Sequence, residues 1–139
     1  YNNDEAFRIG GAKVLRQSEE DKVTVVAAGV TLYEALRAAD ALKGQGIGIT
    51  VIDAYSIKPL AKELSKTAAK KTRNLVVTVE DHYAEGGLGD AVAGELGADG
   101  IQVHKLAVRE LPRSGKAEEL LARYHIDASS ISHKVKALV

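Results

Sequence analysis

The sequence predicts a single α/β domain built around a mostly parallel β-sheet. Apolar stretches of strand length alternate along the chain with stretches in which apolar residues recur every three or four positions. This alternation is typical of βαβ units, in which helices connect parallel strands. The length of 139 residues is that of one ordinary domain. Hydrophobic residues make up 45% of the chain, with only five Tyr and one Phe, so we expect one core of mainly aliphatic side chains.

Four apolar runs are the candidate strands of this sheet. Three of them are nearly continuous, as expected for strands that helices cover on both faces. The fourth contains the polar residues Gln102, His104 and Lys105, which favours a more exposed strand at the edge of the sheet. A further segment, 12–16, is long enough to form one more strand. In chain order, the four runs are 23–28, 47–52, 75–79 and 101–107.

The first two helices are predicted between the strands from their apolar stripes and their end signals. Thr31 and Glu34 have the spacing of a capping box at the start of the first helix, and Gly44 and Gly46 mark its end. Pro59 suits the first turn of the second helix, because a helix leaves its first N–H groups unpaired. The stripes are Leu32, Ala35, Leu36, Ala39 and Leu42 in the first helix, and Leu60, Leu64 and Ala68 in the second.

Three more helices are predicted in the second half of the chain. The third should begin near Gly87, and Asp127 is placed to cap the fifth. Residues 112–116 should form a loop that leads into a short fourth helix. Apolar residues at helical spacing mark all three helices: Leu88, Val92 and Leu96, then Leu120 and Leu121, and finally Ile131, Val135 and Leu138.

Residues 80–92, between the third strand and the third helix, are the most informative segment for function. In open parallel sheets, ligands and partners bind at the carboxyl ends of the strands. One interpretation is a divalent metal held by Glu80, Asp81, His82 and Glu85. Neighbouring strand residues point to opposite sides, so these groups do not easily converge on one ion. We therefore expect no metal site.

Two other interpretations of this segment remain open besides a tight, solvated turn. The glycine-rich turn 86–89 at a helix start is suited to cradle a phosphate or carboxylate, although the nearby acids oppose an anion. We favour a subunit contact, in which the glycines permit close approach and polar side chains bond across the interface. Leu88 or Val92, on the exposed side of the helix, would be its apolar anchor. The expected interface consists of His82, Tyr83, Glu85, Gly86, Gly87, Leu88, Gly89 and Val92.

The loop 112–116 is a second candidate site. Arg113, Ser114 and Lys116 place two cations and a hydroxyl near a helix start, which is a suitable set for an anion. The spacing of a Walker A loop is absent, and a solvated loop is the competing interpretation. We take the scattered His104, His125 and His133 as surface or packing residues. The tyrosines Tyr33, Tyr55 and Tyr124 are expected to serve packing rather than chemistry.

Composition excludes several classes of function. The nineteen basic and nineteen acidic residues cancel, and no basic stripe is present, so we expect neither nucleic acid nor membrane as a partner. The chain has no Cys, which excludes disulfides, thiolate catalysis and cysteine-rich zinc sites. No apolar run approaches the roughly 20 residues of a membrane span and no signal peptide is found, so we expect a cytoplasmic protein. The first residue is Tyr1 rather than Met, and we expect that the chain was cut from a longer one.

Four short segments carry a family resemblance when they are taken together and in order. They are 28–32 with 34–36, 57–60, Glu-Asp-His-Tyr at 80–83 with Glu-Gly-Gly-Leu-Gly at 85–89, and Pro-Arg-Ser-Gly-Lys at 112–116. In this combination, the whole chain resembles the C-terminal domain of transketolases, and the last two segments are the more specific. Residues 1–11 are then expected to be a linker from a preceding domain, and residues 1–139 a single C-terminal domain.

This resemblance implies a fold and a role. The fold would be a three-layer αβα sandwich around a mixed five-stranded sheet whose first strand, at 12–16, runs antiparallel. The parent enzymes are homodimers of the pentose phosphate pathway that move a two-carbon ketol unit between sugar phosphates. Their thiamine diphosphate and divalent cation lie between the two preceding domains.

No catalytic, cofactor-binding or metal-binding residue is therefore carried over to this chain. The isolated domain is expected to be non-catalytic and to serve subunit contact and support, with the preceding domains as its partners. The alternative is a stand-alone α/β domain that binds a small anion or metabolite.

Overall fold

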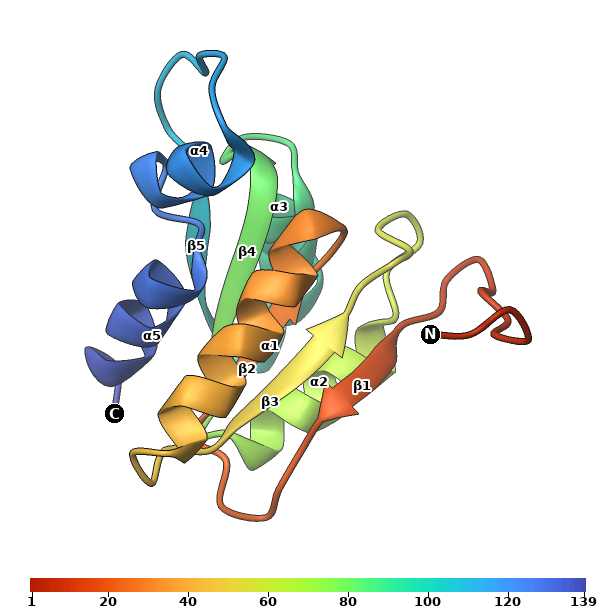
Figure 1. The fold of residues 1–139 in the computed structure, drawn as a ribbon. Coiled ribbons are helices and arrows are strands. Elements are labelled where there is room, and N and C mark those ends of the chain that lie inside the picture. Colours follow the sequence, from red (N-terminus) through yellow and green to blue (C-terminus); the bar gives the residue numbers. More distant parts are fainter.

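The chain forms one mixed five-stranded sheet, described here for residues 1–139 from a computed structural model (Figure 1). The strand order is β1-β3-β2-β4-β5. β1 runs antiparallel to β3, and all other neighbours are parallel. The prediction of a fifth, antiparallel strand near 12–16 is thereby confirmed. The strands are β1 (Lys13–Arg16), β2 (Val23–Ala27), β3 (Ile49–Asp53), β4 (Leu75–Tyr83) and β5 (Gln102–Val108).

Helices cover both faces of the sheet and complete the predicted αβα sandwich (Figure 1). α1 (Val30–Lys43), α4 (Ala117–Arg123) and α5 (Ala128–Lys136) contribute side chains to one apolar cluster. α2 (Lys62–Lys71) and α3 (Leu88–Leu96) contribute to a second cluster on the opposite face. A short 3₁₀ turn, η1 (Gly97–Asp99), follows α3. No helix is long and apolar enough to cross a membrane.

The core is aliphatic, as the composition predicts. Adjacent strand residues point to opposite faces, so Val25 of β2 lies in the cluster under α1 and α5, and Val26 lies in the cluster under α2 and α3. Both side chains are completely buried. Each contributes about 1.5–3 kcal/mol to stability by leaving water, and the pair fixes which face of β2 meets which helices.

The carboxyl ends of the four parallel strands meet at one edge of the sheet. Ala27 of β2 is paired with Asp53 of β3 and with Val79 of β4. β4 continues beyond this line to Tyr83, four residues past the predicted end, because its outer part pairs with Val108 of β5. β5 is an edge strand, as predicted.

The predicted capping box of the first helix is wrong. α1 begins at Val30 after Gly29, and no side chain caps it. The Thr31 hydroxyl instead donates to the Val79 carbonyl, at 2.8 Å, and so ties α1 to β4. The Glu34 carboxylate accepts from the Ala128 N–H at 3.0 Å and ties α1 to the start of α5. Both side chains therefore bond to residues distant in the sequence, and neither caps the start of α1.

Of the other predicted helix starts, one is wrong and two are confirmed. Pro59 does not lie in the first turn of the second helix, because α2 begins only at Lys62. The Pro59 carbonyl instead accepts from the Ser56 hydroxyl within the loop that follows β3. The starts of the third and fifth helices are confirmed: Gly87 precedes α3, and the Asp127 carboxylate caps α5 by accepting from the Ser130 N–H at 3.0 Å.

Candidate functional site

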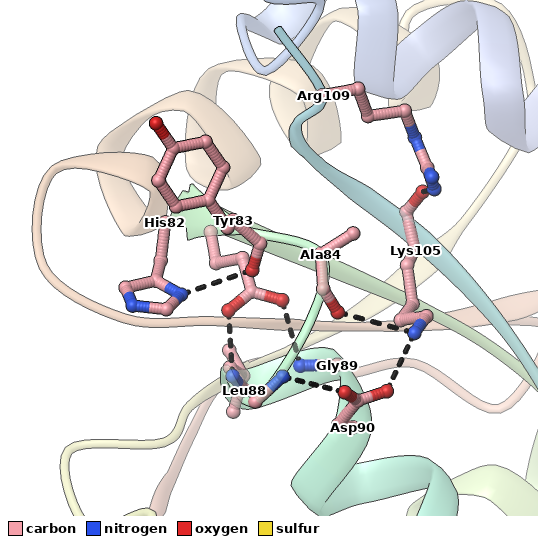
Figure 2. A network of polar contacts seen from close by, with 10 residues as sticks. His82, Tyr83, Ala84, Leu88, Gly89, Asp90, Lys105 and Arg109 are labelled. Carbon is pink, nitrogen blue, oxygen red and sulfur yellow. Dashed lines mark hydrogen bonds and ion pairs between the residues drawn. The ribbon is translucent and has the colours of Figure 1, made fainter. Parts of the chain in front are cut away.

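The junction between β4 and α3 is organised around the buried carboxylate of Glu80. Glu80 lies on the extended part of β4 and is only 4% exposed. Its two oxygens accept from the first amides of α3, at 2.6 Å from Leu88 and 2.8 Å from Gly89 (Figure 2). The helix has no local side-chain cap, so an acid eight residues earlier in the chain supplies the negative charge that a helix start favours.

This arrangement overturns the hypothesis that the turn 86–89 cradles an external anion. The amides of Leu88 and Gly89, which would hold a phosphate, already donate to Glu80. The Gly86 N–H donates to the Asp90 carboxylate at 2.6 Å. An incoming anion would have to displace two carboxylates and bear their repulsion.

A second cluster holds the outer side of the turn. The Lys105 ammonium of β5 donates to the Asp90 carboxylate at 2.6 Å and to the Ala84 carbonyl at 3.3 Å (Figure 2). The hydrogen bond from Lys105, together with that from the Gly86 N–H, holds the pKa of Asp90 below its usual value. These contacts join β5, the turn and α3, so the backbone of the junction is fixed at both sides.

Three of the predicted interface residues project from this rigid junction. His82, Tyr83 and Glu85 are all exposed. The only hydrogen bond of the His82 ring is to its neighbour, in which Nδ1 donates to the Tyr83 carbonyl oxygen at 3.0 Å. Tyr83 keeps 43% of its surface exposed and stands clear of the Glu80 contacts (Figure 2). These side chains are free to contact a partner.

The apolar anchor was predicted wrongly. Leu88 is 2% exposed and Val92 is fully buried, because both face the core beneath α3. Neither is available to a partner without unfolding the helix. Tyr83 is the large apolar side chain that stays accessible in the predicted interface.

The glycines of the turn make room for the domain's own atoms. A Cβ on Gly87 would collide with the Glu80 carboxylate, and a Cβ on Gly89 would lie 2.7 Å from Cγ of Lys105. Gly87 has a φ of −96°, which any residue can adopt. A side chain there would therefore clash with neighbouring atoms without straining the backbone. Gly86, with a φ of 73°, is the position at which the backbone itself requires glycine.

The second candidate site is a solvent-exposed loop. Arg113, Ser114 and Lys116 are all exposed. The Arg113 N–H donates to the hydroxyl of Tyr124 at 2.7 Å, and the Lys116 ammonium lies 3.8 Å from the Glu119 carboxylate. No hydrogen bond joins the three side chains, and anion binding there stays a prediction. Nowhere in the structure do three or more His, Asp or Glu side chains cluster as metal ligands.

Sequence reasoning missed the roles of Glu80 and Lys105. The available signal was an acid at the end of a strand followed by a helix start without a Ser, Thr, Asp or Asn cap. No pattern near Asp90 in the sequence indicates its partner, because Lys105 lies fifteen residues later, on β5.

The sheet order, the antiparallel first strand and the capped β4–α3 junction define a small α/β sandwich domain. The sequence model of the family described as "Transketolase, C-terminal domain" matches residues 11–131. The chain belongs to this family, as its short segments predict.

Transketolases match the chain over its whole length. It is 50% identical over 140 residues to a transketolase of Rattus norvegicus and 49% identical to that of Homo sapiens. It is also 51% identical to "Transketolase-like protein 1" of Macaca fascicularis. In each case all of this chain is covered, but only 22% of the rat and human proteins and 24% of the macaque protein. The chain therefore spans about a fifth of the length of the curated transketolases.

Solved structures agree with this assignment. A structure described as "Split gene transketolase, inactive beta4 tetramer" superposes with a TM-score of 0.91 at 35% identity, covering 99% of this chain and 45% of that one. A transketolase of Campylobacter jejuni superposes with a TM-score of 0.66 at 21% identity, covering 92% of this chain and 18% of that one. At that identity, the second match shows the fold alone.

Proposed function

We propose that the chain serves as the subunit-contact and supporting domain of a cytoplasmic transketolase and is non-catalytic by itself. The enzyme would transfer a two-carbon ketol unit between sugar phosphates, with thiamine diphosphate and a divalent cation bound by its preceding domains. The similar structure described as a split-gene transketolase supports this proposal, because its subunit forms a tetramer described as inactive.

One observation carries the contact role. The junction 80–90 is fixed from beneath by Glu80 and from the side by Lys105 and Asp90, while His82, Tyr83 and Glu85 remain exposed at its tip. Interfaces gain affinity when the contacting groups are already ordered, because little conformational entropy is lost on binding.

The residues of this edge do not fit the diphosphate of the cofactor. The helix-start amides that favour phosphate are occupied by Glu80, and no set of acids and histidines is arranged to bind a divalent cation. We therefore assign no step of ketol transfer to this chain. Its residues position and support neighbouring parts of the enzyme.

A chimera tests this function. The chain replaces the 140 matched residues of the rat transketolase, and ketol transfer is measured with thiamine diphosphate and Mg²⁺. We expect activity from the chimera and none from the 139-residue chain at equal concentration. Calorimetry with the chain alone should show no saturable cofactor binding. Micromolar affinity, which corresponds to about 8 kcal/mol, or an inactive but folded and dimeric chimera, would refute the proposal.

A further inference from the structure

A groove lies where the second half of β5, the edge strand, meets the end of α4 and the start of α5 (Figure 1). It consists of two open cavities of about 330 Å³ each, which share Leu106 and His125 as walls. Ligand pockets in proteins typically have volumes of about 300–1,000 Å³. This β5 groove is therefore large enough for a small molecule, and the exposed residues of the proposed subunit contact line neither cavity.

Two arginines of the first cavity are available to an anion. Arg109 follows β5 directly, and Arg123 is the last residue of α4. The Arg109 guanidinium forms no ion pair, and its Nη2 donates to the Lys105 carbonyl at 3.2 Å (Figure 2). The Arg123 Nε lies 3.5 Å from the Glu110 carboxylate, and both side chains are more than half exposed. Exposed pairs of this kind contribute little to stability, so an incoming anion can replace Glu110.

The remaining walls of the first cavity are mainly apolar. Ala107 and Tyr124 are both buried and line it together with Leu106. Tyr124 thus packs in the domain as predicted, whereas Tyr33 is 63% exposed and the same prediction is wrong for it. Apolar walls with a few polar groups are typical of small-molecule sites.

The second cavity adds hydroxyl groups, an imidazole and an ammonium, and it has no acidic wall. Beyond the two shared residues, its lining consists of Ser129, Ser130, His133 and Lys134. The Ser130 N–H is already bonded to Asp127, so α5 offers side chains to this cavity rather than that amide.

The groove is positively charged although the chain as a whole is neutral. Four Lys or Arg and two His line the two cavities, against the single acid Glu110. The charge of Lys105 is matched by Asp90 of α3, which leaves Arg109, Arg123 and Lys134 as the cations that face one acid. In a chain with nineteen basic and nineteen acidic residues, this local excess favours a negatively charged ligand.

We propose that the β5 groove binds a small, hydroxylated phosphate monoester. Its phosphate group would lie between Arg109 and Arg123, because a phosphate carries a charge of about −1.5 to −2 at pH 7 and accepts paired hydrogen bonds from guanidinium groups. A carboxylate would match only one of the two arginines. The body of the ligand would extend past His125 into the second cavity, where Ser129 and Ser130 donate to or accept from its hydroxyl groups.

Titration of the isotope-labelled chain with ribose 5-phosphate, followed by NMR, tests the site. Ribose and inorganic phosphate are the matched probes, because each carries one half of the proposed ligand. We expect saturable binding of ribose 5-phosphate with a Kd below about 1 mM, with shifted amides in segments 104–110 and 123–134. Each half should bind at least about tenfold more weakly, a difference of about 1.4 kcal/mol. A Kd above about 1 mM, or equal affinity for inorganic phosphate, would overturn the proposal.

Three exposed positions separate this site from unspecific attraction. Arg109→Gln should weaken binding of ribose 5-phosphate at least about tenfold. Glu110→Gln should strengthen it about threefold, because the acid that competes for Arg123 is removed. Arg8→Gln, an exposed arginine of the N-terminal segment, should leave it unchanged, and all three variants should keep the urea midpoint of the wild type.

Two results with these variants would overturn the proposal. Equal weakening by Arg109→Gln and Arg8→Gln would show attraction to the overall positive charge rather than a site. Binding that is lost in Lys116→Gln but kept in Arg109→Gln would place the phosphate on the loop 112–116 instead. Because the free chain is used throughout, neither result depends on the proposed subunit contact.

Discussion

Replacing Glu80 with Gln tests whether its buried carboxylate holds the β4–α3 junction together. The carboxylate accepts from two helix-start amides, at 2.6 and 2.8 Å, in a buried position. A Gln side chain keeps one accepting oxygen but turns an NH₂ donor toward the other amide. One backbone N–H then loses its partner, and a second donor is buried beside it.

The expected loss of stability follows from these two changes. A hydrogen bond to a charged group contributes about 1.5–3 kcal/mol, against about 0.5–1.5 kcal/mol for a neutral one. A buried donor left unpaired costs about 1–3 kcal/mol, and the charge–helix interaction adds about 0.3–1 kcal/mol. Because relaxation of the turn recovers part of this sum, we expect Glu80→Gln to lower the free energy of unfolding by about 2–4 kcal/mol.

Urea denaturation followed by far-UV circular dichroism measures the effect. With a slope of about 2 kcal/mol per molar urea, the midpoint should fall by roughly 1–2 M. Glu85→Gln is the matched control, since Glu85 is an acid of the same turn but is exposed, and its midpoint should be unchanged. A Glu80→Gln midpoint equal to wild type would refute the role of Glu80 as the cap of α3.

Four further substitutions probe the same region and its surroundings. Asp90→Asn should reduce stability at neutral pH, and the difference from wild type should shrink in acid; the pKa of Asp90 is lowered by hydrogen bonds from Lys105 and Gly86, so its contribution is fully present above the unfolded pKa of ~3.9 and is lost as pH falls through the lower pKa of the folded state. A difference in urea midpoint that stays the same as pH falls would contradict this. In α3, Gly89→Ala should destabilise because its Cβ meets Lys105 and Thr78, whereas Gly94→Ala, with open space around it, should stabilise by about 0.5–1 kcal/mol; thermal melts that rank the two variants in the opposite order would be evidence against the packing. Tyr124→Phe should cost about 1 kcal/mol and make the loop 109–116 more sensitive to protease, because the Arg113 N–H loses its acceptor; an unchanged cleavage rate would count against that bond.

The fold was predictable because the strands and helices carry local signals. Continuous apolar runs mark the buried strands, and the polar residues Gln102 and His104 mark the edge strand β5. The direction of β1 came from the family resemblance, since a segment of four residues has no periodicity that reveals its orientation. Asp127 was found as a cap because its partner, the Ser130 N–H, lies three residues away.

Errors arose where distant partners replace local ones. Thr31 and Glu34 have capping-box spacing, yet they bond to Val79 and Ala128, which are far away in the sequence. Leu88 and Val92 were assigned to an exposed helix face, although their spacing of four fits the core side equally well. The exposed residues His82, Tyr83 and Glu85 were predictable as a candidate site because polar residues at a strand end carry functional groups in this class of fold.

Sedimentation of the rat chimera measures the proposed subunit contact most directly. In the variant His82→Ser, Tyr83→Ser and Glu85→Ser, all three altered side chains are exposed, so the free chain should unfold at an unchanged urea concentration. We predict that the dimer of this chimera dissociates at least about tenfold more readily than the unmodified chimera, a loss of about 1.4 kcal/mol, and that ketol transfer falls with the dimer fraction. A dimer of unchanged affinity, with the variant folded, would contradict the assignment of this junction to subunit contact.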